Sequence, residues 1–278
     1  MTRIVITGST GLLGPYLMER AAKRGVAIGV SRHTDPAIDL GVVEQVRKAM
    51  AATRPDVVVH AAGLTDVDAC QRDPAAARRA NHATTECLAM SLPPETQLVY
   101  VSTDQVYPDT AGPHSEDSAA PANVYGASKF AGERATLSHP RGLALRTNLF
   151  GPSRTAGRTS LSDVFAEGFA ARRPMRLFTD LKFSPLHMAT LADLLFELVD
   201  RAATGVLNLG CRAGMTKRDF GLAVAARLGL STETAQDSVS DAIPGRAPRA
   251  KDLRLDVSRV EALLERPMPT LAEEIARL

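Results

Sequence analysis

The stretch Thr7-Gly8-Ser9-Thr10-Gly11-Leu12-Leu13-Gly14 decides the fold, because it sets a glycine-rich loop between a short apolar run and a helical segment. Arg3–Thr7 predicts a buried strand. The apolar residues after the loop recur at helical spacing until Lys23-Arg24-Gly25, a typical helix stop. Glycines permit the unusual dihedrals of such a turn and let its backbone approach a pyrophosphate, while the helix N-terminus supplies N–H donors. This context favours a dinucleotide-binding loop over a tight turn with incidental glycines.

Strands and helices alternate along the rest of the first half. Further strands are expected at Val26–Ser31, Asp56–His60, Gln97–Ser102 and Gly142–Thr147. Helices are expected at Val42–Ala52, Pro74–Leu92 and Tyr125–Ser138. The alternation predicts an α/β fold with a doubly wound parallel sheet, a Rossmann domain, which binds its ligands at the carboxyl ends of the strands.

The alternation of strands and helices becomes less regular after about Asn148, where Pro, Gly and Arg become frequent. Helices remain plausible at Ser160–Ala171, Ala189–Ala202 and Thr216–Leu228, whereas Ile243–Arg249 cannot form a long regular element. We therefore divide the chain into a cofactor-binding domain, 1–148, and a mainly substrate-binding lobe, 149–278. Some segments of the lobe are expected to return to the first domain.

The composition is that of a globular protein that buries a core: 278 residues, 45% hydrophobic and 23% charged, with a net charge of +2. There is no basic stripe to grip a phosphate backbone, so nucleic acid is not an expected partner. Cys70, Cys87 and Cys211 lack metal-ligand spacing, which predicts no metal site and fits a reducing compartment. With no targeting or membrane-spanning segment, we expect a cytoplasmic protein without membrane contact.

The end of the second strand bears on the choice between NADPH and NADH. An acidic residue there would bind a ribose 2′-hydroxyl and repel a 2′-phosphate. This chain has Ser31-Arg32-His33 instead. Because arginine pairs with phosphate in bidentate fashion, we expect Arg32 to bind the cofactor and NADPH to be preferred, with NADH as the alternative. The competing interpretation is an exposed arginine in an ordinary loop.

Tyr125-Gly126-Ala127-Ser128-Lys129 places a tyrosine and a lysine four residues apart at the start of a helix, so both project from one face, roughly 6 Å apart along the axis. An adjacent ammonium favours the phenolate and is expected to bring the pKa of Tyr125 toward neutrality. Lys129 can also hold the nicotinamide ribose. The strand before this helix ends in Ser102-Thr103-Asp104, where a hydroxyl could polarise a carbonyl. Together these residues predict hydride transfer with Tyr125 as the proton donor.

These motifs resemble the extended short-chain dehydrogenase/reductases, and within them the dTDP-4-dehydrorhamnose reductase group, over nearly the whole length. Further matching stretches are Arg54–Ala62, Thr65–Asp68, Asn81, Ser102–Tyr107, Arg146-Thr147, Asp180–Pro185, Val206–Gly210 and Arg249–Asp256. The resemblance implies an NADPH-dependent reductase of a nucleotide-linked 4-keto-6-deoxy sugar. The oligomeric state stays open, with a homodimer as one expectation.

The resemblance also assigns roles to residues. It implies Thr103, Tyr125 and Lys129 as the catalytic triad. The cofactor contacts that it implies, with those expected from the glycine loop, are Gly8, Ser9, Thr10, Gly11, Leu12, Leu13, Asp39, Leu40, Ala61, Ala62 and Gly63. The candidates for substrate contact are Val67, Thr103, Asp104, Asn148 and Arg249.

The chain departs from the family pattern around the sugar. Asn148-Leu149 stands where the family carries Ser-Trp, and the sequence contains no tryptophan. Asp180-Leu181-Lys182-Phe183-Ser184-Pro185 replaces Asp-Gln-x-Gly-Ser-Pro, and Arg249-Ala250 replaces Arg-Pro. The chemistry motifs are intact and the expected sugar pocket is altered, so ketone reduction is the firmer expectation and the identity of the sugar the weaker one.

Three other functions compete with the reductase. A sugar-nucleotide 4,6-dehydratase resembles enzymes with Thr-Asp-Glu, whereas this chain has the amide Gln105 in the third position, which cannot act as a base. A 4-epimerase uses the same Tyr and Lys, but Ser102–Tyr107 looks like the reductase. A non-catalytic regulatory subunit is the third, because the chain also resembles the beta subunit of methionine adenosyltransferase, which preserves the triad.

Arg32→Ala is expected to weaken NADPH binding much more than NADH binding, because only NADPH offers a 2′-phosphate to the guanidinium. Titration of each cofactor into wild type and variant, followed by fluorescence of the dihydronicotinamide ring, measures both affinities. Equal losses for the two cofactors would refute the role given to Arg32.

Overall fold

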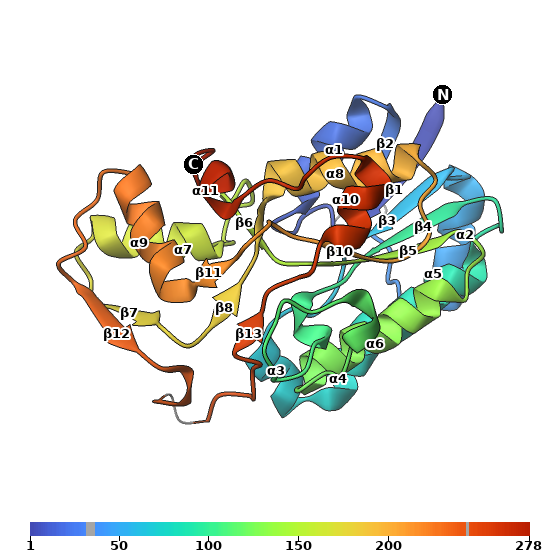
Figure 1. Ribbon diagram of the computed structural model, residues 1–278. Helices are drawn as coiled ribbons and strands as arrows, with labels where there is room; N and C mark the ends of the chain where they lie inside the picture. The colour runs from blue at the N-terminus through green and yellow to red at the C-terminus, as the bar shows by residue number, and fades with distance from the viewer. Residues whose placement is uncertain (32–36, 243–244) are drawn as a thin grey trace.

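The computed structural model describes residues 1–31, 37–242 and 245–278. Within these ranges the largest sheet has six strands, all parallel, in the order β10-β5-β4-β3-β1-β2 (Figure 1). They are β1 Thr2–Thr7, β2 Gly25–Val30, β3 Val57–His60, β4 Gln97–Val101, β5 Gly142–Thr147 and β10 Gly205–Leu209. Because β2 and β3 lie on opposite sides of β1, the crevice at the carboxyl ends of β1 and β3 is the switch point where such sheets bind ligands. The predicted doubly wound α/β fold is confirmed.

The alternation of side chains along β1 explains why both faces of the sheet are covered. Ile4 and Ile6 pack in the larger core, beneath α1 (Gly14–Ala22) and α8 (Met188–Asp200). Val5 points to the opposite face and packs in a second core with residues of α2 (Val43–Thr53) and α5 (Thr84–Ser91). Strands buried on both faces read as continuous apolar runs, as β1, β3 and β4 do.

The single helix expected over Pro74–Leu92 is divided. The chain forms α4 (Pro74–Arg78), then a π-helical turn over Arg79–Ala83, then α5. The π turn contains the fully buried Asn81, whose carbonyl accepts hydrogen bonds from Thr85 and Tyr100. Such an inserted residue re-aims side chains and is frequent at functional sites. Hydrophobic spacing alone does not reveal it.

The remaining predicted helices are confirmed with ends shifted by one or two residues. They are α6 (Val124–Leu137), α7 (Leu161–Ala170) and α9 (Lys217–Arg227), besides α2 and α8. Ser160 and Thr216, which the prediction placed inside helices, are the N-caps of α7 and α9. Three short helices were not predicted: α3 (Val67–Arg72), α10 (Ser258–Leu264) and α11 (Leu271–Ile275). Their few turns give too short a periodic signal to detect.

The second half builds a lobe beside the carboxyl edge of the sheet (Figure 1). In it, α7 and α9 pack together next to β7 (Met175–Phe178), which pairs with β12 (Ala235–Ser238). Short pairings complete it: β6 (Leu149–Phe150) with β9 (Leu186–His187), and β8 (Lys182–Phe183) with β11 (Met215–Thr216) and β13 (Asp252–Leu253). From the same half, β10 joins the large sheet and α8 packs on α1. The division at residue 148 itself stays a prediction.

Two observations concern properties beyond the fold. In the described part of the chain, no helix combines the length and the apolar character needed to cross a bilayer. Cys70, Cys87 and Cys211 are free and buried. Of Ile243–Arg249, residues 243–244 lie outside the described ranges, and residues 245–249 form neither helix nor strand, as expected.

A buried ion pair joins α6 to the sheet. Arg146 on β5 donates to both carboxylate oxygens of Glu133 on α6, at 2.8 to 3.1 Å, and the two side chains are 3% and 1% exposed. Ser102, just after β4, donates to the same carboxylate at 2.5 Å. Arg146 also donates to the Tyr107 hydroxyl and to the Glu116 carbonyl. Each charge is therefore compensated by its partner and by further hydrogen bonds, as burial demands.

Glu133→Gln is expected to lower the free energy of unfolding by about 3–5 kcal/mol, because it leaves the buried Arg146 guanidinium without its counter-charge. Urea denaturation followed by circular dichroism measures the change. Asp237→Asn, which removes the exposed ion pair with Arg218, serves as control and should leave stability nearly unchanged. Equal stabilities for wild type and Glu133→Gln would contradict this account of the pair.

Candidate active site

The glycine loop is pressed against the residues that follow β3. Gly8 has φ of 72°, and a Cβ on it would lie 2.7 Å from the Ala62 nitrogen. A Cβ on Gly14 would lie 2.2 Å from the Ser9 carbonyl oxygen. Neither position has room for a side chain. Glycine at Gly8 therefore lets the loop pack closely against the residues after β3, and the loop backbone is not covered by side chains of these two residues. Ala61 and Ala62 therefore lie next to the loop, and Gly63 borders Asn81. Their contact with a cofactor stays a prediction.

The other predicted cofactor residues are those of the glycine loop, the pair Asp39-Leu40, and Arg32. In the loop, Leu13 is buried in the core, Thr10 is exposed, and Ser9, Gly11 and Leu12 are half-buried. Leu40 is buried on the α2 face of the sheet, and Asp39 is exposed, its carboxylate accepting from the Gly41 nitrogen at 2.9 Å. Arg32 lies outside the described residues.

His60, at the end of β3, bonds Thr7 across the switch point. Its Nδ1 lies 2.7 Å from the Thr7 hydroxyl oxygen, which also accepts from the Ala62 nitrogen at 3.3 Å. The ring is fully buried, and its Nε2 has no hydrogen-bond partner in the described ranges. Burial, with a smaller contribution from the Lys129 charge, lowers the pKa of His60 to about 3. His60 is thus a buried, neutral residue between the ends of β1 and β3.

Thr103 and Tyr125 meet beyond the carboxyl end of β4. Thr103 N-caps a short 3-10 turn, Asp104–Val106, and Tyr125 lies in the first turn of α6, which Asn123 caps by accepting from the Gly126 nitrogen at 2.8 Å. Burial raises the pKa of the Tyr125 phenol above its ordinary range, against the lowering effect of a hydrogen bond with Thr103. The expectation that a neighbouring ammonium dominates the pKa of Tyr125 is therefore wrong for this structure.

The position of Lys129 explains this difference. Its ammonium donates to the Val101 carbonyl at 2.7 Å and lies 4.0 Å from the centroid of the Tyr100 ring. It is directed toward β4 and not toward the Tyr125 hydroxyl. Burial lowers the pKa of Lys129 to about 7, while the Glu133 carboxylate one turn along α6 acts in the opposite direction. A Cβ on Gly63 would lie 4.0 Å from the Lys129 Nζ, so the ammonium also borders the predicted cofactor edge.

Asn81 connects this edge to α6. Its amide oxygen accepts from the Leu64 nitrogen at 2.8 Å, and its amide nitrogen donates to the Leu64 carbonyl and to the Ser128 hydroxyl, each at 2.9 Å. The Gly63-Leu64 backbone is thus held against the helix that carries Tyr125 and Lys129. Asn81 contributed to the family resemblance but was given no role from the sequence, because the π turn that aims it is not visible there.

Asp104 is a buried carboxyl group among hydrogen-bond donors. The Asn148 amide donates to its Oδ2 at 2.6 Å and the Thr103 hydroxyl to its Oδ1 at 3.2 Å. Burial raises the pKa of Asp104 to about 6, although Asn148, the Lys217 charge and Thr103 lower it. Two predicted substrate residues, Asp104 and Asn148, therefore lie together beside Thr103. The lysine that acts on them, Lys217, was missed by sequence reasoning.

The last predicted substrate residues lie on and against α3. Val67 begins this helix and packs in a small apolar cluster that includes Tyr125. Asp68, the next residue, receives two hydrogen bonds from Arg249, at 2.9 and 3.1 Å. The Arg249 side chain, from the segment before β13, holds the pKa of Asp68 at about 2. The sequence offered no sign of a pair whose partners are so far apart in the chain.

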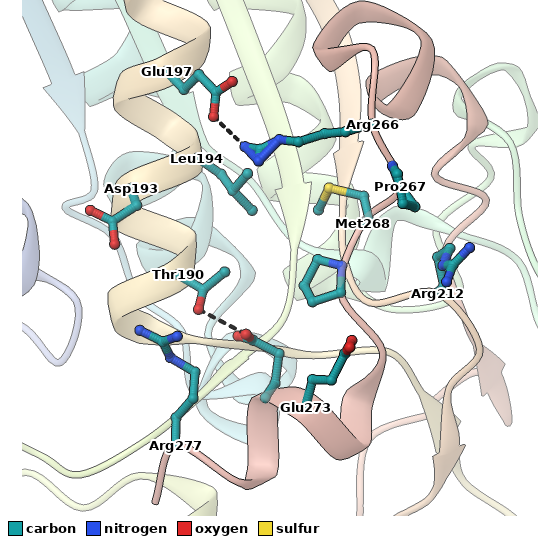
Figure 2. Close-up of a pocket in the computed structure, with 12 residues that line it drawn as sticks. Thr190, Asp193, Leu194, Glu197, Arg212, Arg266, Pro267, Met268, Glu273 and Arg277 are labelled. Atoms are coloured by element: carbon teal, nitrogen blue, oxygen red, sulfur yellow. Dashed lines mark hydrogen bonds and ion pairs between the residues drawn. The ribbon is translucent and has the colours of Figure 1, made fainter.

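A groove of 540 Å³ lies elsewhere, between α8 and the C-terminal segment (Figure 2). Two of its acidic side chains have partners within it: Glu197 pairs with Arg266, and Glu274 accepts a hydrogen bond from the Thr190 hydroxyl at 2.9 Å. None of the predicted site residues lines it. The groove is therefore separate from the predicted site.

In the described ranges, no group of three or more His, Cys, Asp or Glu side chains is arranged to hold a metal ion. What the site does offer is a buried phenol, a threonine hydroxyl, an ammonium and a glycine-lined backbone within one crevice. These groups suit proton transfer next to a dinucleotide.

Comparison with known proteins agrees with this geometry. The family model of the RmlD substrate binding domain matches residues 1–278. A dTDP-4-dehydrorhamnose reductase of Mycobacterium tuberculosis is 30% identical over 89% of this chain and 83% of its own length. Methionine adenosyltransferase 2 subunit beta of Xenopus laevis is 26% identical over 94% of this chain and 82% of its own.

Among solved structures, a dTDP-4-dehydrorhamnose reductase of Bacillus anthracis in complex with NADP superposes with a TM-score of 0.91. The match is 21% identical and covers 100% of this chain and 98% of that one, so it bears on the fold alone. With the family model matched end to end, the chain belongs to the RmlD substrate binding domain family, within the extended short-chain dehydrogenase/reductases, and is an oxidoreductase of that family.

Proposed function

We propose that the protein reduces a nucleotide-linked 4-keto-6-deoxy sugar, taking hydride from NADPH and a proton from Tyr125. The observation that carries this proposal is the buried Tyr125 phenol, which lies beside Thr103 at the carboxyl edge of the sheet, the edge that also carries the glycine loop. Proximity follows from a chain of close contacts: Gly8 lies against Ala62, and Gly63 lies against Lys129. Reduction of a ketone needs these groups together.

The fit of the cofactor rests on backbone that no side chain could replace. At Gly8 and Gly14 a Cβ would collide with neighbouring backbone, so the loop can present its N–H groups to a pyrophosphate at the start of α1. Ala61, Ala62 and Gly63 would flank the nicotinamide half, and Lys129 would hold its ribose. Arg32 would contact the 2′-phosphate of NADPH. The bound cofactor would supply the hydride, and the dTDP-4-dehydrorhamnose reductase of Bacillus anthracis, solved in complex with NADP, is the precedent for it.

The protonation state of Tyr125 suits reduction more than oxidation. Because burial raises its pKa, the phenol keeps its proton at neutral pH and can donate it to the oxygen that gains charge as hydride arrives. Thr103 would turn its hydroxyl proton from Asp104 toward the same oxygen when substrate binds. Lys129 would leave the Val101 carbonyl to bind the ribose and would then bring its charge nearer to the phenol.

The identity of the sugar rests on Val67, Asp104, Asn148 and Arg249. Asp104 can accept a hydrogen bond from a sugar hydroxyl when it is ionised, and Asn148 fixes its orientation. Leu149 stands where the family carries tryptophan and is half-buried in the lobe core. The dTDP-linked rhamnose precursor is the substrate that the family resemblance implies. Because Leu149 replaces the family's tryptophan, a related keto sugar that packs differently against this position is a second candidate substrate.

A regulatory role is the second candidate function, favoured by the similarity to methionine adenosyltransferase 2 subunit beta. Turnover of any keto sugar separates the two, since a purely regulatory subunit would bind cofactor without reducing substrate. The dehydratase gains no support, because Gln105 is engaged as an acceptor from Asn123 at 3.0 Å. The epimerase would differ by returning the hydride to the sugar. A cytoplasmic location and a homodimer remain predictions.

Tyr125→Phe is expected to lower turnover by about 100- to 10,000-fold, the usual contribution of a general acid, while leaving NADPH affinity nearly unchanged. Absorbance of the dihydronicotinamide ring follows turnover with a panel of nucleotide-linked 4-keto sugars. Tyr16→Phe is the matched control, because Tyr16 is also buried and its hydroxyl donates to the Pro152 carbonyl, away from Thr103 and Lys129. Retained turnover in Tyr125→Phe would sink the assignment.

The raised pKa of Asp104 predicts that kcat/KM falls on the acidic side of its pH profile. Its pKa is raised to about 6, so it is protonated below that pH and cannot accept from the sugar. The ratio kcat/KM, which reports the free enzyme, should therefore fall as pH drops through about 6. Asp104→Asn should react more slowly and lose this limb. A limb that persists unchanged in Asp104→Asn would show that another group titrates.

A further inference from the structure

A hydrogen bond joins the second half of the chain to the glycine loop. The Thr155 hydroxyl donates to the Gly11 carbonyl at 3.1 Å, across 144 positions of the sequence. Within the described ranges, it is the one hydrogen bond between the loop, residues 8–14, and residues 149–278. Thr155 lies in the irregular segment between β6 and α7, so the bond belongs to neither a helix nor a sheet. Its place in the fold therefore needs another explanation.

The turn that carries Thr155 is fixed to the start of α7. The Ser153 hydroxyl donates to the Thr155 carbonyl at 3.1 Å and accepts from the Thr155 nitrogen at 3.3 Å. The Ser153 nitrogen donates to the Asp163 carboxylate at 3.0 Å. The same carboxylate accepts from the Ser160 nitrogen in the capping box of α7. The Thr155 hydroxyl is thus presented by a turn that a lobe helix holds.

The residue between them joins this turn to α1. Arg154 donates to the Glu19 carboxylate at 2.7 Å, and Glu19 lies on α1, the helix that follows the glycine loop. Both side chains are partly exposed, so the pair contributes little to stability. What it does constrain is position. The turn is held on one side by α7 and on the other by α1, with the Thr155 hydroxyl bonded to Gly11.

The bond to Gly11 constrains a whole peptide unit, because the Gly11 carbonyl and the Leu12 N–H belong to the same planar group. In a trans peptide these two groups point in opposite directions, so Thr155 directs the Leu12 N–H away from the 153–155 turn. Leu12 precedes the N-cap of α1, Leu13, so no intrahelical bond uses this N–H. An N–H with a fixed direction at a helix start is suited to an anion.

Stability does not require the bond. Gly11 and Thr155 are both half-buried, so water could satisfy the carbonyl and the hydroxyl if they separated. Glycine also restricts its own dihedrals less than any other residue, so Gly11 alone does not hold the peptide in one orientation. The contact therefore affects the direction of the loop N–H more than the folded state as a whole.

We propose that Thr155 is a positioning residue for the cofactor: through the Gly11-Leu12 peptide, its hydroxyl holds the loop N–H in the direction that binds the pyrophosphate. The inference rests on the cofactor site of the proposed function. Because NADPH and NADH share the pyrophosphate, Thr155 acts on both equally, unlike Arg32, whose proposed partner is the 2′-phosphate. The lobe thereby takes part in binding the cofactor as well as in the proposed binding of the substrate.

Titration of NADPH and of NADH, followed by fluorescence of the dihydronicotinamide ring, tests this role without turnover. Thr155→Val keeps the shape of the side chain but removes the donor. It should raise the dissociation constants of both cofactors about fivefold, the effect of one ordinary hydrogen bond. Thr155→Ser keeps the hydroxyl and should bind both cofactors nearly as wild type does. Without cofactor, the melting temperatures of both variants should match that of wild type.

Thr179→Val is the matched control, because the half-buried Thr179 also donates to a backbone carbonyl within the lobe, that of Ser238 at 3.2 Å. It should bind both cofactors as wild type does. Wild-type affinities in Thr155→Val would overturn the role of Thr155. So would a loss for one cofactor only, a Thr155→Ser variant as weak as Thr155→Val, or an equal loss in Thr179→Val.

The same titrations separate this role from the proposed function. Wild type that binds neither NADPH nor NADH would overturn both. The expected pattern of affinities in a protein that reduces no keto sugar would retain the role of Thr155 and refute the reductase alone.

Discussion

The buried ion pair between Glu133 and Arg146 is the contact on which the geometry of the site depends. It joins α6 to β5. Ser102, the residue after β4, donates a hydrogen bond to the same Glu133 carboxylate, so the end of β4 is joined to α6 as well. Ser102 precedes Thr103, and Glu133 lies one turn beyond Lys129, so this one carboxylate fixes the end of β4 relative to the start of α6. The phenol and the threonine hydroxyl meet because of that constraint. A charge pair with so little exposure serves position more than stability, since replacing both partners by apolar groups is often neutral.

Burial shifts the pKa values of the acidic and basic groups of the site in opposite directions, and this suits the site to reduction. The same low polarity that keeps the proton on Tyr125 lowers the pKa of Lys129 to about 7 and raises that of Asp104 to about 6. In each group burial shifts the pKa in the direction that favours the uncharged form. Binding of a polyanionic cofactor and substrate would favour the charged ammonium of Lys129 again. The site is therefore arranged to become polar when both ligands are present, which suits proton donation coupled to hydride transfer.

Local patterns were sufficient to predict much of the fold. The glycine loop and the strands β1 to β5 depend on short segments with strong patterns, and parallel strand ends bring the loop, Thr103 and Tyr125 to one edge of the sheet. The catalytic roles of Thr103, Tyr125 and Lys129 stay predictions. Contacts across long stretches of chain were not predictable: Arg249 with Asp68, Asn81 with Leu64, and Lys217 near Asp104. Predicting the pKa of Tyr125 failed for the same reason, because burial depends on packing that spacing does not encode. Lys217, the first residue of α9, departs from the usual helix pattern, because the N-terminal end of a helix disfavours a cation.

Transfer of deuterium from the cofactor tests the central claim most directly. The protein would be incubated with NADPH carrying deuterium at the transferable position and a nucleotide-linked 4-keto sugar, and the product analysed by mass spectrometry and proton NMR. The account predicts one deuterium on the carbon that carried the ketone, with one equivalent of cofactor oxidised. A product without deuterium, or cofactor that stays reduced with every keto sugar offered, would contradict it.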